Sequence, residues 1–253
     1  PVLYIEDPEG ITRDLKKSTI DAINKINKEE YAKYADPEIL ARINQYEMAY
    51  RMQIAVPKVM NINSEPEHIK QMYGVEEGKE SFANNCLLAR KLVEDGVRFV
   101  QLFDWGWDTH GNVREGSIDL GLRNKCREID RPITALILDL KQRGLLDDTL
   151  IVWGGEFGRQ PTAEYAKGSG RDHNSYGFTM WMAGGGIKGG TSVGTTDELG
   201  GRAVDDKFHV KHLHATILHQ MGLNPEKLSY FFGGLDNKLV GVEGAQPIWK
   251  VMS

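Results

Sequence analysis

The N-terminal part of the chain alternates apolar and charged residues at helical spacing. One helix is expected first, and its apolar positions are Leu15, Ile20, Ile23, Ile26 and Tyr31. A second helix is expected after Asp36-Pro37, with an apolar stripe that contains Tyr46, Tyr50 and Met52. Pro57, Asn61–Ser64 and Pro66 are expected to break the helical pattern. The periodicity therefore predicts that residues 1–80 form a mainly helical cap or inserted segment.

The rest of the chain, residues 81–253, alternates between helix-like and strand-like segments. Helices are expected at residues 81–95, 127–143 and 212–221, and each is followed directly by glycine. Apolar runs predict strands at residues 97–103, 150–153 and 178–183. This alternation predicts an α/β fold, with a mostly parallel sheet flanked by helices. In such a sheet, ligands bind at the carboxyl ends of the strands.

Composition and charge exclude several classes of function. The chain has 253 residues, 40% of them apolar, which is enough for one large domain or two modest ones. The formal net charge of −5 argues against nucleic acid as a partner. No apolar run approaches the about 18–20 residues of a membrane span. Cys86 and Cys126 lack metal-ligand spacing; we expect buried free thiols, with a disulfide as the alternative.

Histidines and carboxylates gather beside glycines in the second half of the chain, where six of the seven histidines fall between residues 110 and 219. Imidazole nitrogens and carboxylate oxygens are ligands of divalent metals such as zinc and manganese. Two groups of these residues directly follow predicted strands, and another lies in a polar loop. We therefore predict a divalent metal site, with zinc favoured over manganese or calcium. Its predicted ligands are Asp108, His110, Glu156, Asp172 and His173.

Each candidate also has a purely structural interpretation. Asp108 and His110 fit a polar loop with tryptophans against a sheet edge, and Glu156 fits an ion pair with Arg159. Asp172 and His173 fit a structural hydrogen bond. Further histidines near the predicted C-terminal helix are candidate ligands, of which at least one is expected to be ordinary surface: His209, His212 and His214. His68 and His219 are assigned to structure.

Two arginines are candidates for binding an anionic substrate. Arg159 and Arg171 lie close to the predicted ligands, and guanidinium groups match the geometry of phosphate or sulfate. Surface salt bridges are the alternative for both. The glycine-rich run 184–190 lacks the spacing of a phosphate-binding loop and predicts only a tight turn.

Several segments together resemble one protein family. Residues 133–153 read as a helix that runs into a strand, and residues 212–223 as a helix that begins with His-Leu-His. With Trp-Asp-Thr-His-Gly, Gly-Glu-Phe-Gly-Arg and Gly-Arg-Asp-His-Asn, they resemble an uncharacterised, sulfatase-like bacterial family of the alkaline phosphatase superfamily. The resemblance covers residues 80–253. It implies an exported or periplasmic metal-dependent hydrolase of phosphate or sulfate esters, with a small molecule or glycan as substrate.

The resemblance also assigns ligands and marks two departures. It implies one metal pair at Asp108 and His110, further ligands at Asp172-His173, and a remaining histidine at His214. The first departure is Glu156-Phe157, which stands where the superfamily has Asp-His. The second is the nucleophile, because residues 1–80 contain no strand followed by a suitable Asp and Ser or Thr.

We therefore expect the chain, which begins at Pro1, to be a piece of a longer protein whose N-terminal half carries the nucleophile. A non-catalytic, metal-stabilised binding or scaffold protein is the first alternative. An amidohydrolase-like enzyme that uses His212 and His214 is the second.

Overall fold

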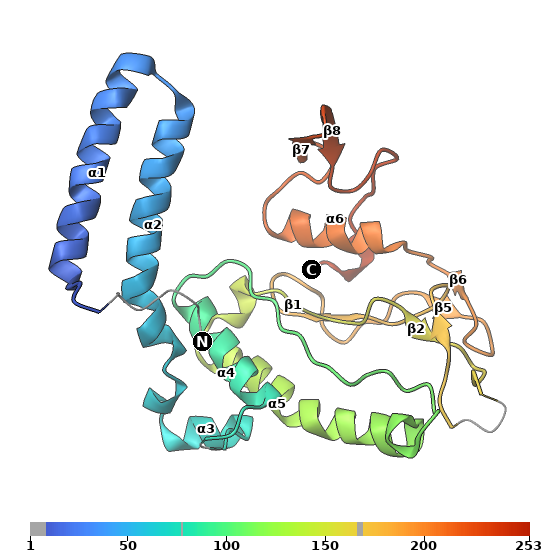
Figure 1. Ribbon diagram of the computed structural model, residues 1–253. Helices are drawn as coiled ribbons and strands as arrows, with labels where there is room; N and C mark the ends of the chain where they lie inside the picture. The colour runs from blue at the N-terminus through green and yellow to red at the C-terminus, as the bar shows by residue number, and fades with distance from the viewer. Residues whose placement is uncertain (1–8, 77, 166–168) are drawn as a thin grey trace.

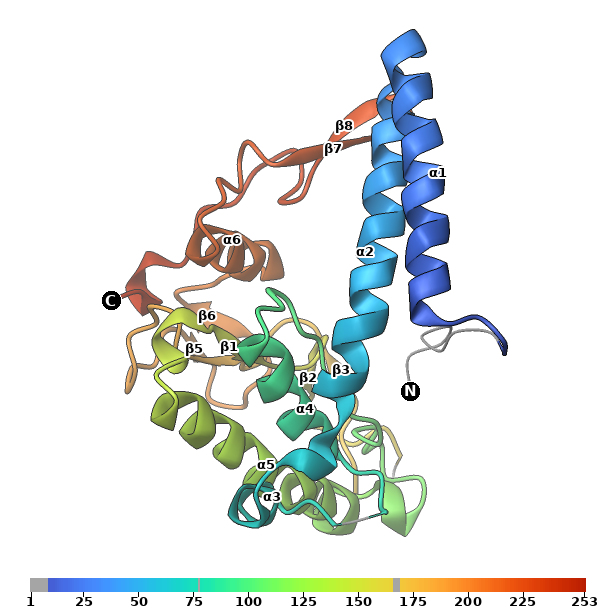
Figure 2. The same cartoon turned by 90° about the vertical axis from the view of Figure 1, so that its left-hand side faces the viewer.

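Two long helices form a hairpin that projects from the rest of the molecule (Figures 1 and 2). The computed structural model describes residues 9–76, 78–165 and 169–253. The hairpin consists of α1 (Arg13–Tyr34) and α2 (Pro37–Met60), close to where the periodicity predicted them. Side-chain oxygens of Thr12 and Asp36 accept hydrogen bonds from backbone N–H groups and cap the two helices. The break expected at Pro57 is wrong, since α2 continues through this residue.

Three further helices enclose the main hydrophobic core: α3 (Glu67–Tyr73), α4 (Phe82–Glu94) and α5 (Arg123–Gln142). The Ser81 hydroxyl accepts the backbone N–H of Asn84 and starts α4 at the predicted residue. The buried core side chains are Ile69, Tyr73, Cys86, Leu87, Ala135, Leu136 and Leu140. Short helical turns join these elements: η1 (Ile62–Ser64), η2 (Arg114–Gly116), η3 (Ile118–Leu122), η4 (Leu146–Asp148) and η5 (Trp249–Val251).

Both cysteines are free thiols in this fold. Cys86 is buried in the core, and burial, together with the nearby Asp104 carboxylate, raises the pKa of its thiol to about 12. The thiol is therefore protonated and unreactive at neutral pH. Cys126 is exposed on α5, contrary to the expectation that both thiols are buried.

A buried network of charges fastens the core helices to one another. The Arg90 side chain is only 1% exposed, and its guanidinium forms ion pairs with Glu65, Glu94 and Asp139. The Tyr73 hydroxyl donates a hydrogen bond to Asp139 at 3.1 Å. Burial and the Asp139 charge raise the pKa of Tyr73 far above its usual range, so this phenol stays neutral and continues to donate.

Glu65 makes the stability of this network depend on pH. Burial by itself raises the pKa of Glu65, but hydrogen bonds from Arg90 and Lys91 outweigh it and hold the pKa below the usual 4.5. A carboxyl group with a lowered folded-state pKa stabilises the fold above its unfolded pKa. That contribution is lost as pH falls through the folded pKa.

We expect Glu65→Gln to lower the free energy of unfolding at neutral pH by about 1.5–3 kcal/mol, the range for hydrogen bonds to charged groups. The difference from wild type should shrink as pH falls below the usual 4.5. Urea unfolding between about pH 7 and about pH 3 measures this, with Glu47→Gln, in an exposed pair with Arg51, as the control. A difference that stays constant down to about pH 3 would show that Glu65 does not titrate in this way.

The strands form separate antiparallel pairs, and the prediction of a mostly parallel sheet is wrong. The pairs are β1 (Ile151–Trp153) with β4 (Trp181–Ala183), β2 (Gly158–Arg159) with β3 (His173–Asn174), β5 (Thr195–Thr196) with β6 (Ala203–Asp205), and β7 (Ser229–Phe232) with β8 (Leu235–Lys238). Parallel neighbours need a long crossover, usually a helix. The residues that the structure describes between β1 and β6 contain no helix, and the chain returns in the opposite direction.

Residues 97–103 also depart from prediction. They belong to no strand: the N–H of Val97 donates to the carbonyl of Leu92, and residues 98–103 form no backbone hydrogen bonds with other residues that the structure describes. The other predicted strands are present as β1 and β4, each somewhat shorter than expected.

The C-terminal part contains α6 (Val210–Gln220), close to the predicted helix at 212–221, and then the β7–β8 hairpin (Figure 1). A small second core forms here from Ala215, Val240 and Ala245. Among the described helices, none has the length and apolar content of a membrane span, which agrees with the sequence.

Candidate metal centre

Two loops that are distant in sequence cross each other through a pair of glycines. One loop contains Asp108 and His110, and the other leads into β3 and His173. At the crossing, a Cβ atom placed on Gly170 would lie 1.9 Å from the backbone carbon of His110, and one placed on Gly111 would lie 2.1 Å from the Gly170 nitrogen. Only glycine permits so close an approach of two backbones. The glycines that flank both sequence motifs therefore bring their polar side chains together.

Backbone hydrogen bonds hold the crossing in place. The N–H of Arg171 donates to the carbonyl of Thr109 at 2.9 Å, and the N–H of Ile118 donates to Ser169 at 3.0 Å. Thr109 itself is buried, at 3% exposed. The two loops are thus joined on both sides of the glycine contact.

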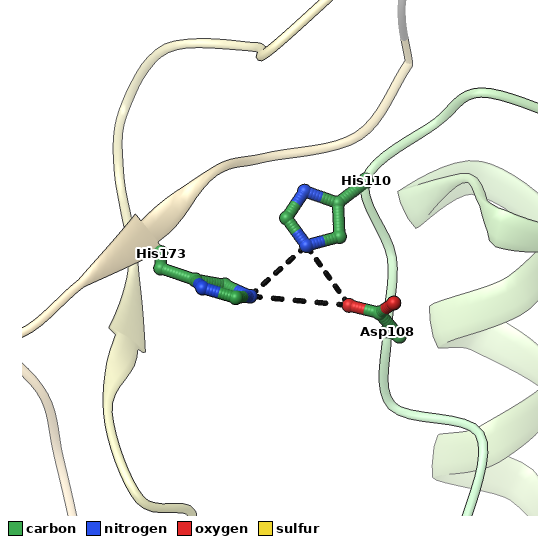
Figure 3. A group of neighbouring side chains, drawn as sticks. All are labelled: Asp108, His110 and His173. Carbon is green, nitrogen blue, oxygen red and sulfur yellow. Dashed lines mark hydrogen bonds and ion pairs between the residues drawn. The ribbon is translucent and has the colours of Figure 1, made fainter.

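Asp108, His110 and His173 point toward one another (Figure 3). The Nε2 atom of His110 lies 2.9 Å from Asp108 Oδ1 and 3.0 Å from His173 Nε2. The Nε2 atom of His173 lies 3.9 Å from the same Asp108 oxygen. The His110 ring is largely buried, whereas Asp108 and His173 are exposed, so the group opens to solvent on one side.

Two acidic side chains belong to a second group around His110. Glu164 Oε2 lies 2.5 Å from His110 Nδ1, the ring nitrogen opposite the first group. The contact lacks the angles of a hydrogen bond, and the buried Nδ1 atom has no hydrogen-bond partner among the described residues. His110, Glu164 and Asp172 offer ligand atoms close enough together to hold an ion. Sequence reasoning missed Glu164, because no glycine or strand boundary marks it.

Arg159 lies against the same centre. The β2–β3 ribbon pairs Arg159 directly with His173, which places the guanidinium beside the metal-ligand candidates. Its Nη1 atom lies 3.2 Å from His110 Nε2, and its Nη2 atom lies 3.5 Å from Asp108 Oδ1. Arg171, the other arginine predicted to bind an anion, instead donates to the carbonyl of Gly170 at 2.8 Å.

Two predicted ligands lie outside both groups. Glu156 is exposed in the turn between β1 and β2, and His214 is exposed on α6. Neighbouring histidines have structural contacts: His209 accepts the backbone N–H of Lys211 at the start of α6, and His212 bonds to the carbonyl of Gln246. The geometry therefore separates these residues from Asp108, His110 and His173.

Neighbouring side chains support the two loops from behind. Asp104 accepts hydrogen bonds from the Trp107 indole at 2.8 Å and from Lys125 at 3.1 Å. The Trp107 ring packs edge-on against Trp153 of β1. On the other loop, the buried Asn174 amide donates to three backbone carbonyls, those of Gly177, Gly200 and Gly201. The sequence placed Trp107 and Asn174 next to the ligands but did not reveal these supporting contacts.

The donor set of the first group fits a divalent metal ion. For zinc–ligand bonds of about 2.0–2.1 Å, ligand atoms at tetrahedral angles are about 3.3–3.4 Å apart. The three distances between the ligand atoms of Asp108, His110 and His173 are 2.9, 3.0 and 3.9 Å, which lie on both sides of that value. Two histidines and one carboxylate form a set that zinc and iron accept in catalytic sites, where further positions stay open.

Comparison with known proteins assigns the chain to a family. Residues 1–252 match the family described as protein of unknown function (DUF1501). The chain belongs to this family. This agrees with the predicted membership of a domain of unknown function, and the DUF1501 match extends beyond residues 80–253 to the N-terminal helices. No curated protein and no solved structure matches the chain.

Proposed function

We propose that this DUF1501 chain binds a divalent metal ion, zinc first, through Asp108, His110 and His173. The single observation that carries the proposal is the convergence of two imidazoles and one carboxylate from loops 63 residues apart. Three protein ligands with a solvent-open side are typical of catalytic metal sites, whereas structural zinc sites are closed by four.

We further propose that the site hydrolyses a phosphate or sulfate ester, in line with the resemblance to sulfatase-like hydrolases. A bound zinc ion supplies a Lewis acid for an ester oxygen and lowers the pKa of an attacking group. Arg159 supports an anionic substrate, since its guanidinium already lies at the centre and matches phosphate and sulfate oxygens. Besides His110, the Arg159 guanidinium contacts the Asp108 carboxylate and the backbone carbonyls of Trp107 and Arg171.

Metal analysis of the purified chain tests the first proposal. We expect about one zinc ion per chain, and we expect His173→Ala to weaken zinc binding at least about 100-fold, because it removes one of three ligands. His214→Ala is the matched control, since this histidine is exposed on α6 outside both groups. Wild-type protein without stoichiometric metal, or equal loss in both variants, would contradict the site.

Hydrolysis assays test the second proposal. Because the resemblance places the nucleophile outside this chain, a zinc-bound water would be the attacking group here. On this basis the zinc-loaded chain should hydrolyse an aryl phosphate or an aryl sulfate, and Arg159→Met should raise KM at least about 10-fold, because it removes the anion contact. Stoichiometric zinc without either activity would reject the hydrolase and would favour a metal-stabilised binding protein.

A further inference from the structure

The two ring nitrogens of His110 face different partners. The Nε2 atom lies 2.9 Å from Asp108 Oδ1 and 3.0 Å from His173 Nε2, which are the ligand atoms of the proposed zinc site. The other ring nitrogen, Nδ1, points away from that group (Figure 3) and lies 2.5 Å from Glu164 Oε2. Glu164 therefore contacts the imidazole on the side opposite the proposed metal position.

Backbone hydrogen bonds hold the loop that carries Glu164. The N–H of Gln160 donates to the carbonyl of Asp172 at 2.7 Å, and the N–H of Asp172 donates to the carbonyl of Thr162 at 3.3 Å. These bonds continue the pairing of β2 with β3 to a point two residues before Glu164. The ribbon that contributes His173 to the candidate centre thus also brings Glu164 to it.

Arg159 indicates which nitrogen of the His110 ring carries the proton. A guanidinium group can only donate, so the contact of 3.2 Å from Arg159 Nη1 to His110 Nε2 requires a lone pair on Nε2. A neutral imidazole then carries its proton on Nδ1, on the side of Glu164. The Nδ1 atom is buried, and a buried donor needs an acceptor to offset its desolvation.

We propose that Glu164 is a positioning residue of the metal centre: it accepts the Nδ1 proton of His110 and thereby directs the Nε2 lone pair to the metal ion. The inference rests on the proposed zinc site and adds a residue to it. Metal-binding histidines commonly donate their other ring N–H to a carboxylate, which fixes the tautomer and the ring orientation. The last side-chain torsion of glutamate is soft, so the carboxylate can turn from its present angle into line with this N–H.

Zinc titration of Glu164 variants tests the proposal. We expect Glu164→Ala to weaken zinc binding about 10–100-fold, the range for loss of a group that orients a metal ligand. Glu164→Gln keeps an oxygen acceptor without the charge, so it should weaken zinc binding less than Glu164→Ala does. The control is Glu47→Gln, in an exposed pair with Arg51 on the helical hairpin, which should bind zinc like wild type. Urea unfolding of the zinc-free variants establishes that each one is folded.

Two spectroscopic measurements separate positioning from a general loss of structure. Cobalt(II) serves as a probe of the same centre, because its visible absorption depends on the geometry of its ligands. This spectrum should change in Glu164→Ala even at saturating cobalt, when every chain holds an ion. In the zinc-loaded wild-type chain, ¹⁵N NMR of labelled histidine should show the His110 proton on Nδ1.

The possible results distinguish this inference from the zinc site on which it rests. Wild-type zinc affinity in Glu164→Ala, an unchanged cobalt spectrum, or a His110 proton on Nε2 overturns the inference and leaves the zinc site standing. A wild-type chain that binds no zinc overturns both. Two zinc ions per wild-type chain, one of them lost in Glu164→Ala, would make Glu164 a direct ligand and also overturn its positioning role. If Glu164→Ala does not fold, the same measurements on Glu164→Gln decide the matter.

Discussion

Gly170→Ala is expected to lower the free energy of unfolding by at least about 3 kcal/mol, at the upper end for overpacked positions. The added Cβ would lie 1.9 Å from the His110 carbon, 2.2 Å from its oxygen and 2.3 Å from the Gly111 nitrogen. All three atoms belong to the backbone, so no side-chain rotation relieves the contact. The loops must separate, and the hydrogen bond from Arg171 to Thr109 is lost with them.

The matched control for this variant is Gly189→Ala. An added Cβ at Gly189 meets no atom within 4 Å, and its backbone is not left-handed. We expect this variant to be within about 0.5 kcal/mol of wild type or slightly more stable. Urea unfolding of both variants, with zinc binding measured in parallel, compares them. A loss below about 1 kcal/mol for Gly170→Ala, with zinc binding retained, would show that the loops do not cross as described.

Arg90→Met is expected to cost about 3–5 kcal/mol of folding free energy, the range for breaking a buried ion pair by removing one partner. The variant keeps most of the side-chain volume but leaves Asp139, which is 2% exposed, and Glu65, which is 11% exposed, without their shared cation. Arg143 still pairs with Asp139 at 2.7 Å, and Lys91 still pairs with Glu65 at 3.0 Å. These remaining partners keep the variant from unfolding outright.

Arg51→Met is the control for this loss. Arg51 is 79% exposed and reaches Glu47 at 3.4 Å on the helical hairpin, and exposed pairs of this kind contribute about 0.3–0.5 kcal/mol. The loss in free energy of unfolding, measured by denaturant unfolding, should therefore be several-fold larger for Arg90→Met than for Arg51→Met. Equal losses would show that the network around Arg90 contributes no more than a surface pair does.

Most of the helices were predictable from the sequence, whereas α3, directly after the expected break, and the sheet were not. Helices α1, α2, α4, α5 and α6 follow from local periodicity, and α4 also from its Ser81 cap. Strand pairing is not local: the direction of β4 against β1 is set by nearly thirty intervening residues that contain no helix where the structure describes them. The prediction of a parallel sheet failed at this step because an apolar run carries no information about which strand it meets.

The candidate ligands that lie in the Trp-Asp-Thr-His-Gly and Gly-Arg-Asp-His-Asn motifs were predictable from the sequence. Asp108, His110 and His173 stand beside glycines, and the glycine crossing gives that arrangement its physical reason. Glu164 was missed because its position depends on how the loop after β2 folds back over His110. Glu156 and His214 were predicted as ligands from similar sequence patterns, but in the fold they lie outside both groups of candidate ligands.

The span between the two loops has a consequence for the order of folding. His110 and His173 are separated by 63 residues, so the chain must close a long loop before they can meet. Loop closure has an entropic cost that non-local contacts recover only after it is complete. The helical core closes a loop of similar length, since the hydrogen bond between Tyr73 and Asp139 spans 66 residues. If zinc binds at the proposed site, its uptake during refolding is expected only after the two loops have met.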